Sequence, residues 1–93
     1  MPGKVTVHIP TPLRGQVDQQ ARLEVAGETV GEVLLALVER YPKLRGRLLD
    51  DSDRLNRFVN VFLNEEDIRF LGHLDTKVKE ADGIMIVPAI AGG

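Results

Sequence analysis

The stretch IMIVPAIAGG, residues 84–93, joins an apolar run to a proline and two closing glycines. Its first four residues have the composition of a buried strand. Pro88 has no N–H to give to a sheet ladder, so we expect the strand to end there. No charged side chain follows Gly83, although chain ends are usually polar. The stretch therefore predicts a strand that carries the last five residues out of a sheet.

These last five residues are small and narrow, and we interpret them as a working segment. Glycine lacks a Cβ, so the backbone of Gly92 and Gly93 can enter a channel too tight for other residues. Fully extended, residues 89–93 would reach roughly 17 Å, at about 3.4 Å per residue. On the glycine pair alone, the alternative that this segment is an incidental flexible end stays open. We predict that the carboxylate of Gly93 is the reactive group and that residues 89–93 form a flexible tail.

The rest of the chain predicts the sheet that this strand enters. Residues 4–9, 21–25 and 57–63 alternate apolar and polar side chains, which indicates three strands with one buried face each. Residues 64–67 have turn composition, and residues 68–70 are expected to form a short fourth strand.

One main helix is expected between the second and third strands. Thr29 and Glu32 have the spacing of a capping box. Apolar residues then recur at helical spacing as far as Tyr41, and Pro42 ends the helix. A short second helical turn is expected near residues 44–49.

This order of elements is that of the β-grasp, or ubiquitin-like, fold. It is an α+β architecture with a mixed sheet of about five strands, one main helix on one face and a protruding C-terminal tail. The last strand lies parallel to the first in that fold, which leaves the C-terminus free to project.

Composition limits the function classes. Ninety-three residues make one domain, residues 1–93, with 43% hydrophobic and 28% charged side chains. A net charge of −2 gives no electrostatic footprint for nucleic acid. No apolar run is long enough for a membrane, and no signal-peptide pattern is visible, so we expect a cytoplasmic protein.

Catalytic and metal-binding groups are scarce. There is no cysteine, which excludes disulfides and thiolate chemistry. His8 and His73 do not have the spacing of zinc ligands, and residues 50–53 lack the glycine of a calcium loop. We therefore expect no metal site, and no enzyme acting alone, because no nucleophile–base set is visible.

The ending VPAIAGG, residues 87–93, resembles that of the ThiS/MoaD family of ubiquitin-like sulfur carriers. RFVNVFLN at residues 57–64 and EEDIRF at residues 65–70 are most similar to the CysO subgroup, and residues 5–14 fit the same group. The resemblance spans nearly the whole chain. One departure lies at residues 81–83, where many members place Gly-Asp, and we expect it to affect the turn and not the activity.

The resemblance implies a carrier without an active site or bound cofactor of its own. An adenylating enzyme related to ubiquitin activators would use ATP and Mg²⁺ to join AMP to the Gly93 carboxylate, and sulfide or a persulfide would then give a thiocarboxylate. In the CysO subgroup the acceptor would be an aminoacrylate on a pyridoxal phosphate enzyme, and the product cysteine. The tail sequence does not exclude three alternative functions, namely the small subunit of molybdopterin synthase, a thiamine-pathway sulfur carrier, and a protein modifier conjugated through Gly93.

A docking surface for these partners is expected on the sheet face opposite the helix. Phe58, Phe62, Met85 and Val87 fall on that face by alternation and would form an apolar patch if exposed. The alternative is that loops or the short second helix cover them. The expected partner-binding residues are these four and the tail, namely Pro88, Ala89, Ile90, Ala91 and Gly92.

Overall fold

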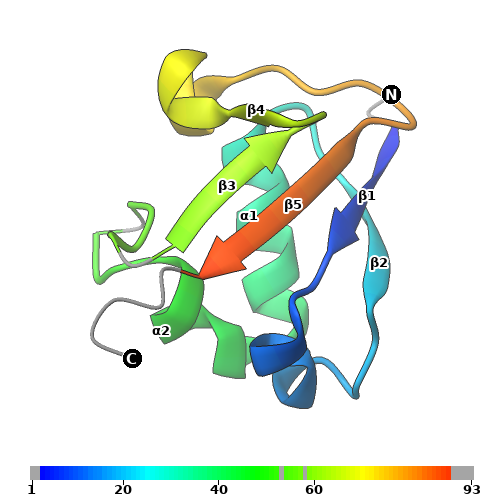
Figure 1. The fold of residues 1–93 in the computed structure, drawn as a ribbon, viewed down its shortest axis with the longest axis vertical. Helices are drawn as coiled ribbons and strands as arrows, with labels where there is room; N and C mark the ends of the chain where they lie inside the picture. The colour runs from blue at the N-terminus through cyan, green and yellow to red at the C-terminus, as the bar shows by residue number, and fades with distance from the viewer. Residues whose placement is uncertain (1–2, 53, 58, 89–93) are drawn as a thin grey trace.

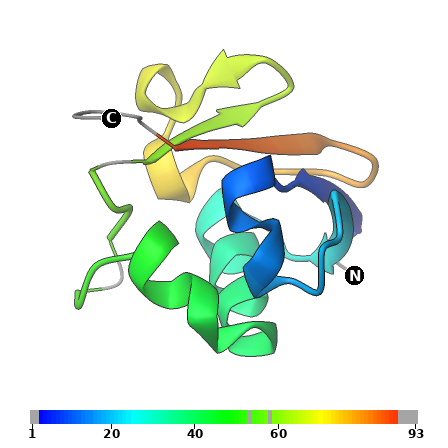
Figure 2. The same ribbon diagram turned by 60° about the horizontal axis from the view of Figure 1, so that its bottom comes forward.

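A computed structural model describes residues 3–52, 54–57 and 59–88. The helices and strands, with 3-10 helices labelled η, are, in chain order, β1 (Lys4–His8), η1 (Thr11–Gln16), β2 (Arg22–Ala26), α1 (Val30–Arg40), η2 (Pro42–Leu44), α2 (Arg45–Leu48), β3 (Val59–Leu63), β4 (Glu66–Asp67), η3 (Ile68–Phe70), η4 (His73–Asp75) and β5 (Gly83–Pro88). The strands form one mixed sheet in the order β2-β1-β5-β3-β4, with α1 behind it (Figure 1). Figure 2 shows α1 and α2 on the same side of the sheet. This arrangement confirms the predicted β-grasp fold.

β5 lies in the middle of the sheet. It runs parallel to β1, with Ile84 opposite Val7, and antiparallel to β3, with Ile86 opposite Val61. β1 and β2 form the expected antiparallel hairpin. The parallel pairing of the first and last strands is therefore confirmed, and β5 ends at Pro88, beside the start of β3 (Figure 1).

The core lies between the sheet and the helices. Alternate residues of each long strand are buried, and they meet the apolar stripe of α1. Each fully buried aliphatic side chain contributes about 1.5–3 kcal/mol of transfer free energy. No polar or charged residue is buried among the described residues. The side chains with no exposed area include Val5, Val7, Val30, Leu34, Leu37, Val61 and Ile84.

The start of α1 is capped as predicted. The Glu32 N–H donates to Thr29 Oγ1 at 3.1 Å, and the Glu32 carboxylate accepts from the N–H of Glu28 at 3.3 Å. The reciprocal bond therefore reaches one residue further back than in the usual capping box. The helix ends at Arg40, one residue before the expected Tyr41. The short second helical turn is also present, as η2 and α2.

The expectations for residues 64–70 were wrong in part. Residues 68–70 form η3 and not a strand, and the short fourth strand is Glu66–Asp67, inside the expected turn. The cause is local, because the Asp67 carboxylate accepts from the N–H of Arg69 at 2.9 Å and so caps the helical turn. The helical conformation lets Ile68 enter the core with no exposed area.

The long strands also differ from the expected ranges by one or two residues at their ends, and one helical segment was not expected. The third strand was expected from residue 57, but β3 begins at Val59, and Phe58 lies outside the described residues. Residues 11–16 form η1, which alternation could not reveal, because Pro12 and Gly15 interrupt any periodic pattern. η1 places Leu13 in the core at 3% exposure.

Asn64 connects the hairpin between β3 and β4 to the start of β5. Its Oδ1 accepts from the Gly83 N–H at 2.9 Å, and its Nδ2 donates to Asp82 Oδ1 at 3.0 Å. Asp82 Oδ2 in turn accepts from the N–H of Lys79 at 2.9 Å. Ala81, the residue before Asp82, has a φ of 73°, in the left-handed region that favours glycine. The departure from the family sequence at residues 81–83 therefore lies in the turn that precedes β5.

The Asp82 network predicts a pH dependence of stability. The hydrogen bond from the Asn64 amide, followed by that from the Lys79 N–H, lowers the pKa of Asp82 below its ordinary value of 3.8. A carboxyl group with a lowered pKa in the folded state stabilises the fold above the unfolded pKa and loses this effect as pH falls through the folded pKa. We expect Asp82→Asn to lower the melting temperature slightly near pH 7 and to leave it unchanged at the lowest pH at which the protein still folds.

Thermal melts of both proteins from neutral to acidic pH would measure this effect. Asp50 and Asp67 also have lowered pKa values, because their carboxylates accept hydrogen bonds from the Arg54 N–H and from the Arg69 side chain respectively, and both contribute a pH dependence of the same sign. The informative quantity is therefore the difference between the wild-type and Asp82→Asn curves. A difference that stays constant across the pH range would contradict the prediction.

Candidate functional site

The candidate site is the outer face of the sheet formed by β5 and β3, near the point at which β5 ends and β3 begins. Met85 lies opposite Phe62 on β3 and beside His8 on β1, and Val87 lies opposite Asn60. Directly opposed residues project from the same face of a sheet. Phe62, Met85 and Val87 therefore come together on the face away from α1, as predicted.

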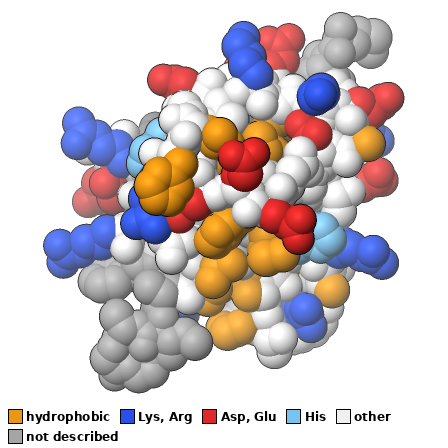
Figure 3. Space-filling model, turned by 45° about the horizontal axis from the view of Figure 1, so that its top comes forward, with side chains coloured by type: hydrophobic (Ala, Val, Ile, Leu, Met, Phe, Trp, Pro, Cys, Tyr) orange, Lys and Arg blue, Asp and Glu red, His pale blue; other side chains and the backbone are white. Residues whose placement is uncertain are grey.

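This face is partly accessible to a partner. Met85 is 46% exposed, and Phe62 and Val87 are half-buried. On the surface seen in Figure 3, hydrophobic side chains gather below the centre of the view among acidic and basic residues. The short second helix, which the sequence left as a possible cover, lies on the opposite face (Figure 2). The patch is thus an apolar surface with a charged rim, which suits protein docking.

Pro88 is the last described residue and ends β5 opposite Val59. Its ring removes the N–H that would continue the ladder, as the sequence predicted. The expected reactive group at Gly93 and the tail residues Ala89, Ile90, Ala91 and Gly92 lie outside the described residues, as does Phe58. Their assigned roles stay predictions.

A groove of about 290 Å³ adjoins the patch at Pro88. It is lined by the end of β1 and the residues after it, His8–Pro10, by Arg14 of η1, and by Met85–Pro88 of β5. The sequence analysis did not predict this groove, because one wall of the groove comes from η1, a helix that the sequence pattern does not reveal. His8 was expected to be a surface histidine without a role, and the sheet places it beside Met85.

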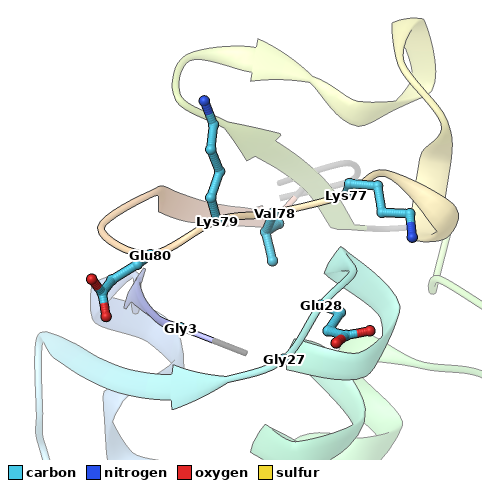
Figure 4. A pocket seen from close by; sticks show the side chains of 7 residues that line it. All are labelled: Gly3, Gly27, Glu28, Lys77, Val78, Lys79 and Glu80. Atoms are coloured by element: carbon cyan, nitrogen blue, oxygen red, sulfur yellow. The ribbon is translucent and has the colours of Figure 1, made fainter. Parts of the chain in front are cut away.

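A second hollow, of about 480 Å³, lies at the opposite end of β5. It is lined by Gly3, Gly27, Glu28 and residues 77–80 (Figure 4). The charged ends of Lys77, Lys79 and the two glutamates point in different directions in Figure 4 and do not converge on a common point. This hollow offers no arrangement of groups for binding or catalysis.

Residues 3–52, 54–57 and 59–88 contain no group of three or more histidine or acidic side chains that could hold a metal ion. In the same residues, no helix has both the length and the apolar character needed to cross a membrane.

A β-grasp sheet with an apolar outer face at the end of its last strand defines a ubiquitin-like protein. The ThiS family model matches residues 7–93. The chain is 43% identical to the sulfur carrier protein CysO of Mycobacterium tuberculosis over 91 residues, which cover 96% of this chain and 98% of that protein. This chain belongs to the ThiS family.

Solved structures agree with this assignment. The crystal structure of the Amycolatopsis orientalis BexX/CysO complex contains a chain that is 42% identical, with a TM-score of 0.87, over 96% of this chain and 99% of that one. The solution structure of small archaeal modifier protein 1 from Methanosarcina acetivorans is 31% identical, with a TM-score of 0.89, over 100% of this chain and 99% of that one. Both likenesses extend over nearly the whole length of each chain.

Proposed function

We propose that this protein is a sulfur carrier that delivers sulfur for cysteine formation. The observation that carries the proposal is the 43% identity to the sulfur carrier CysO along almost the full length of both proteins. The fold is consistent with that role, since it ends its central strand at the rim of an apolar face and leaves five further residues for a partner enzyme.

The chemistry follows from the properties of the Gly93 carboxylate. With a pKa of about 3.5, a free α-carboxylate is ionised at neutral pH and is a poor electrophile. An adenylating enzyme, using ATP and Mg²⁺, would let the carboxylate oxygen attack the α-phosphorus and release pyrophosphate. Sulfide would then attack the acyl carbon and expel AMP, which leaves a thiocarboxylate. The carried sulfur is thus a nucleophile, although the chain has no cysteine.

The partners follow from these two steps. The adenylating enzyme would dock on the face formed by Phe62, Met85 and Val87, and the tail would enter its active site. A second enzyme, a pyridoxal phosphate synthase, would accept the sulfur, and hydrolysis of the acyl bond would release cysteine and restore the Gly93 carboxylate.

A second candidate function is protein modification. Small archaeal modifier protein 1, as its name says, is a modifier, and it has the higher TM-score of the two structures, at lower identity. In this case a lysine amine of a target would attack the adenylated Gly93, expel AMP and form an isopeptide bond. Both candidates share the activation step, so only the acceptor separates them.

Intact mass spectrometry tests the proposal. The protein is incubated with the adenylating enzyme of the same organism, ATP, Mg²⁺ and sulfide. We expect a mass gain equal to one sulfur-for-oxygen exchange, located at Gly93 by fragmentation. A Gly93 deletion should show no gain and should keep the melting temperature of the intact chain, because Gly93 has no side chain to pack and follows Ile86, the last buried residue of β5, by seven residues.

The same incubation separates the two candidates. Addition of a pyridoxal phosphate cysteine synthase together with an O-activated serine, which supplies the carbon skeleton as an aminoacrylate, should transfer the sulfur to that skeleton; hydrolysis of the resulting carrier–cysteine acyl bond should then return the carrier to its original mass and yield cysteine. Adducts with other proteins that survive a denaturing gel, without transfer of sulfur to the synthase, would favour the modifier. A carrier whose mass does not change with either partner would refute both.

A further inference from the structure

The groove beside Pro88 exists because the pairing of β1 with β5 stops early. Their register places His8 opposite Met85, so the next donor from β1 would be the N–H of residue 10. Residue 10 is proline and has no N–H. The carbonyl of Ile86 therefore receives no bond from β1, and the chain turns away into η1. The space between the separating strands is the groove.

Arg14 provides the charge at this groove. Its Nε donates to the carbonyl of Ile9 at 3.0 Å, which holds the half-buried side chain against the end of β1. The described residues give this side chain no other hydrogen bond and no ion pair. The two terminal nitrogens of the guanidinium group are thus available to a ligand, and their planar geometry matches a carboxylate.

The walls of the groove are largely apolar. Ile9 and Ile86 form part of them and are each 2% exposed, and Pro10, Val87 and Pro88 are half-buried. His8, which lies opposite Met85, also lines the groove. The groove therefore combines an apolar lining, one cationic group and one carbonyl, that of Ile86, which receives no hydrogen bond from β1.

The position of the groove limits what can cover it. Five residues follow Pro88, and fully extended they reach roughly 17 Å. An enzyme that acts on Gly93 must bring its own surface within that distance of Pro88. Met85 and Val87 belong both to the groove and to the apolar patch, so an enzyme seated on the patch also covers the groove.

We propose that this groove receives a segment of the adenylating enzyme in which a carboxylate lies next to an apolar side chain, and that Arg14 binds the carboxylate. This inference rests on the proposed function and adds the chemistry of the partner. The apolar side chain of the enzyme would fill the groove, and its carboxylate would form a bidentate ion pair with the terminal nitrogens of Arg14. The contact positions the enzyme and takes no part in the acyl transfer.

Charge reversal at Arg14 tests the proposal. We expect Arg14→Glu to lower kcat/KM for thiocarboxylation at low ionic strength by at least about tenfold, through KM, with kcat unchanged. Raising the salt to about 0.5 M should reduce the wild-type kcat/KM and should narrow the gap to the variant, because salt screens a surface ion pair. The matched control is Arg47→Glu on α2, an exposed arginine behind the sheet, which we expect to change kcat/KM less than about twofold.

A second variant separates binding from folding. Arg14→Gln also loses the bond to the Ile9 carbonyl but introduces no negative charge. If Arg14 only supports the end of β1, the two variants should have equal kcat/KM and the wild-type salt dependence, and the proposal would be overturned. Dimerisation of the wild type that Arg14→Glu abolishes, with unchanged kinetics, would assign the groove to a second copy and would also overturn it. A wild type that is never thiocarboxylated would refute the proposed function itself, which distinguishes the two failures.

Discussion

Met85→Asp is expected to lower kcat/KM for activation by the adenylating enzyme by about thirtyfold or more, because a charge replaces the most exposed apolar side chain of the docking face. Loss of a central interface contact costs about 2 kcal/mol, and 1.4 kcal/mol corresponds to a factor of ten. Met85 lies between His8 and Phe62 on the outer face, and its 46% exposure means that the core is not disturbed. The melting temperature should therefore stay close to that of the wild type.

Position 85 is a better probe than position 62. Phe62 lies opposite Asp67 on β4, so Phe62→Asp would place two carboxylates side by side and weaken the sheet. An effect on activation could then not be separated from an effect on folding. Met85 has no acidic neighbour in the register of β1 and β3.

Phe70→Asp serves as the matched control for Met85→Asp. Phe70 is 82% exposed but lies on η3, outside the sheet face. Steady-state rates of ATP-dependent pyrophosphate release, measured at several carrier concentrations, would give kcat/KM for the three proteins. Equal losses for the two variants would show that exposed apolar groups matter wherever they lie, and the docking face would lose its special role.

Ile84→Ala is expected to have the opposite effect to Met85→Asp: a large loss of stability with nearly normal activation by the adenylating enzyme. Ile84 has no exposed area and lies on β5 between Val7 of β1 and Leu63 of β3. Truncation of a buried isoleucine to alanine costs about 2–5 kcal/mol, since it removes apolar contacts and leaves a cavity. For a chain of 93 residues this is a large part of a total free energy of unfolding of about 5–15 kcal/mol.

The neighbouring residue provides the control for this second prediction. Met85→Ala removes a side chain of similar size from the opposite face of the same strand, and we expect a loss below about 1 kcal/mol. Urea titration followed by circular dichroism would give both free energies of unfolding. Activation by the adenylating enzyme, expressed per folded molecule, should be nearly normal for Ile84→Ala. Similar stability losses for the two variants would mean that the faces of β5 are not assigned correctly.

Much of the fold could be predicted from the sequence, because its main elements depend on local patterns. Alternation in residues 4–9 and the capping residues Thr29 and Glu32 each define an element without reference to distant parts of the chain. The region of residues 64–70 was misjudged for a reason that is also local. The Asp67 carboxylate competes for the N–H of Arg69 and produces a helical turn where strand composition would suggest a strand.

The candidate site was predictable to a smaller extent. Alternation placed Phe62, Met85 and Val87 on one face, and the sheet confirms this arrangement. Arg14 and His8 could not be connected to them, because nothing in a linear pattern relates residues 8–14 to residues 85–88. Their proximity depends on the parallel pairing of the first and last strands.

By itself, the sequence determined the order of elements, the apolar alternation of β5 and the end of that strand at Pro88, since each follows from the geometry of a few adjacent residues. The tertiary structure alone decided which groups surround that end. The register of β1 with β5, the missing N–H of Pro10 and the course of η1 together bring a cation and an apolar groove beside Pro88. The physical reason is that pairing between strands more than 70 residues apart is settled by burial of the whole core, which no short stretch encodes.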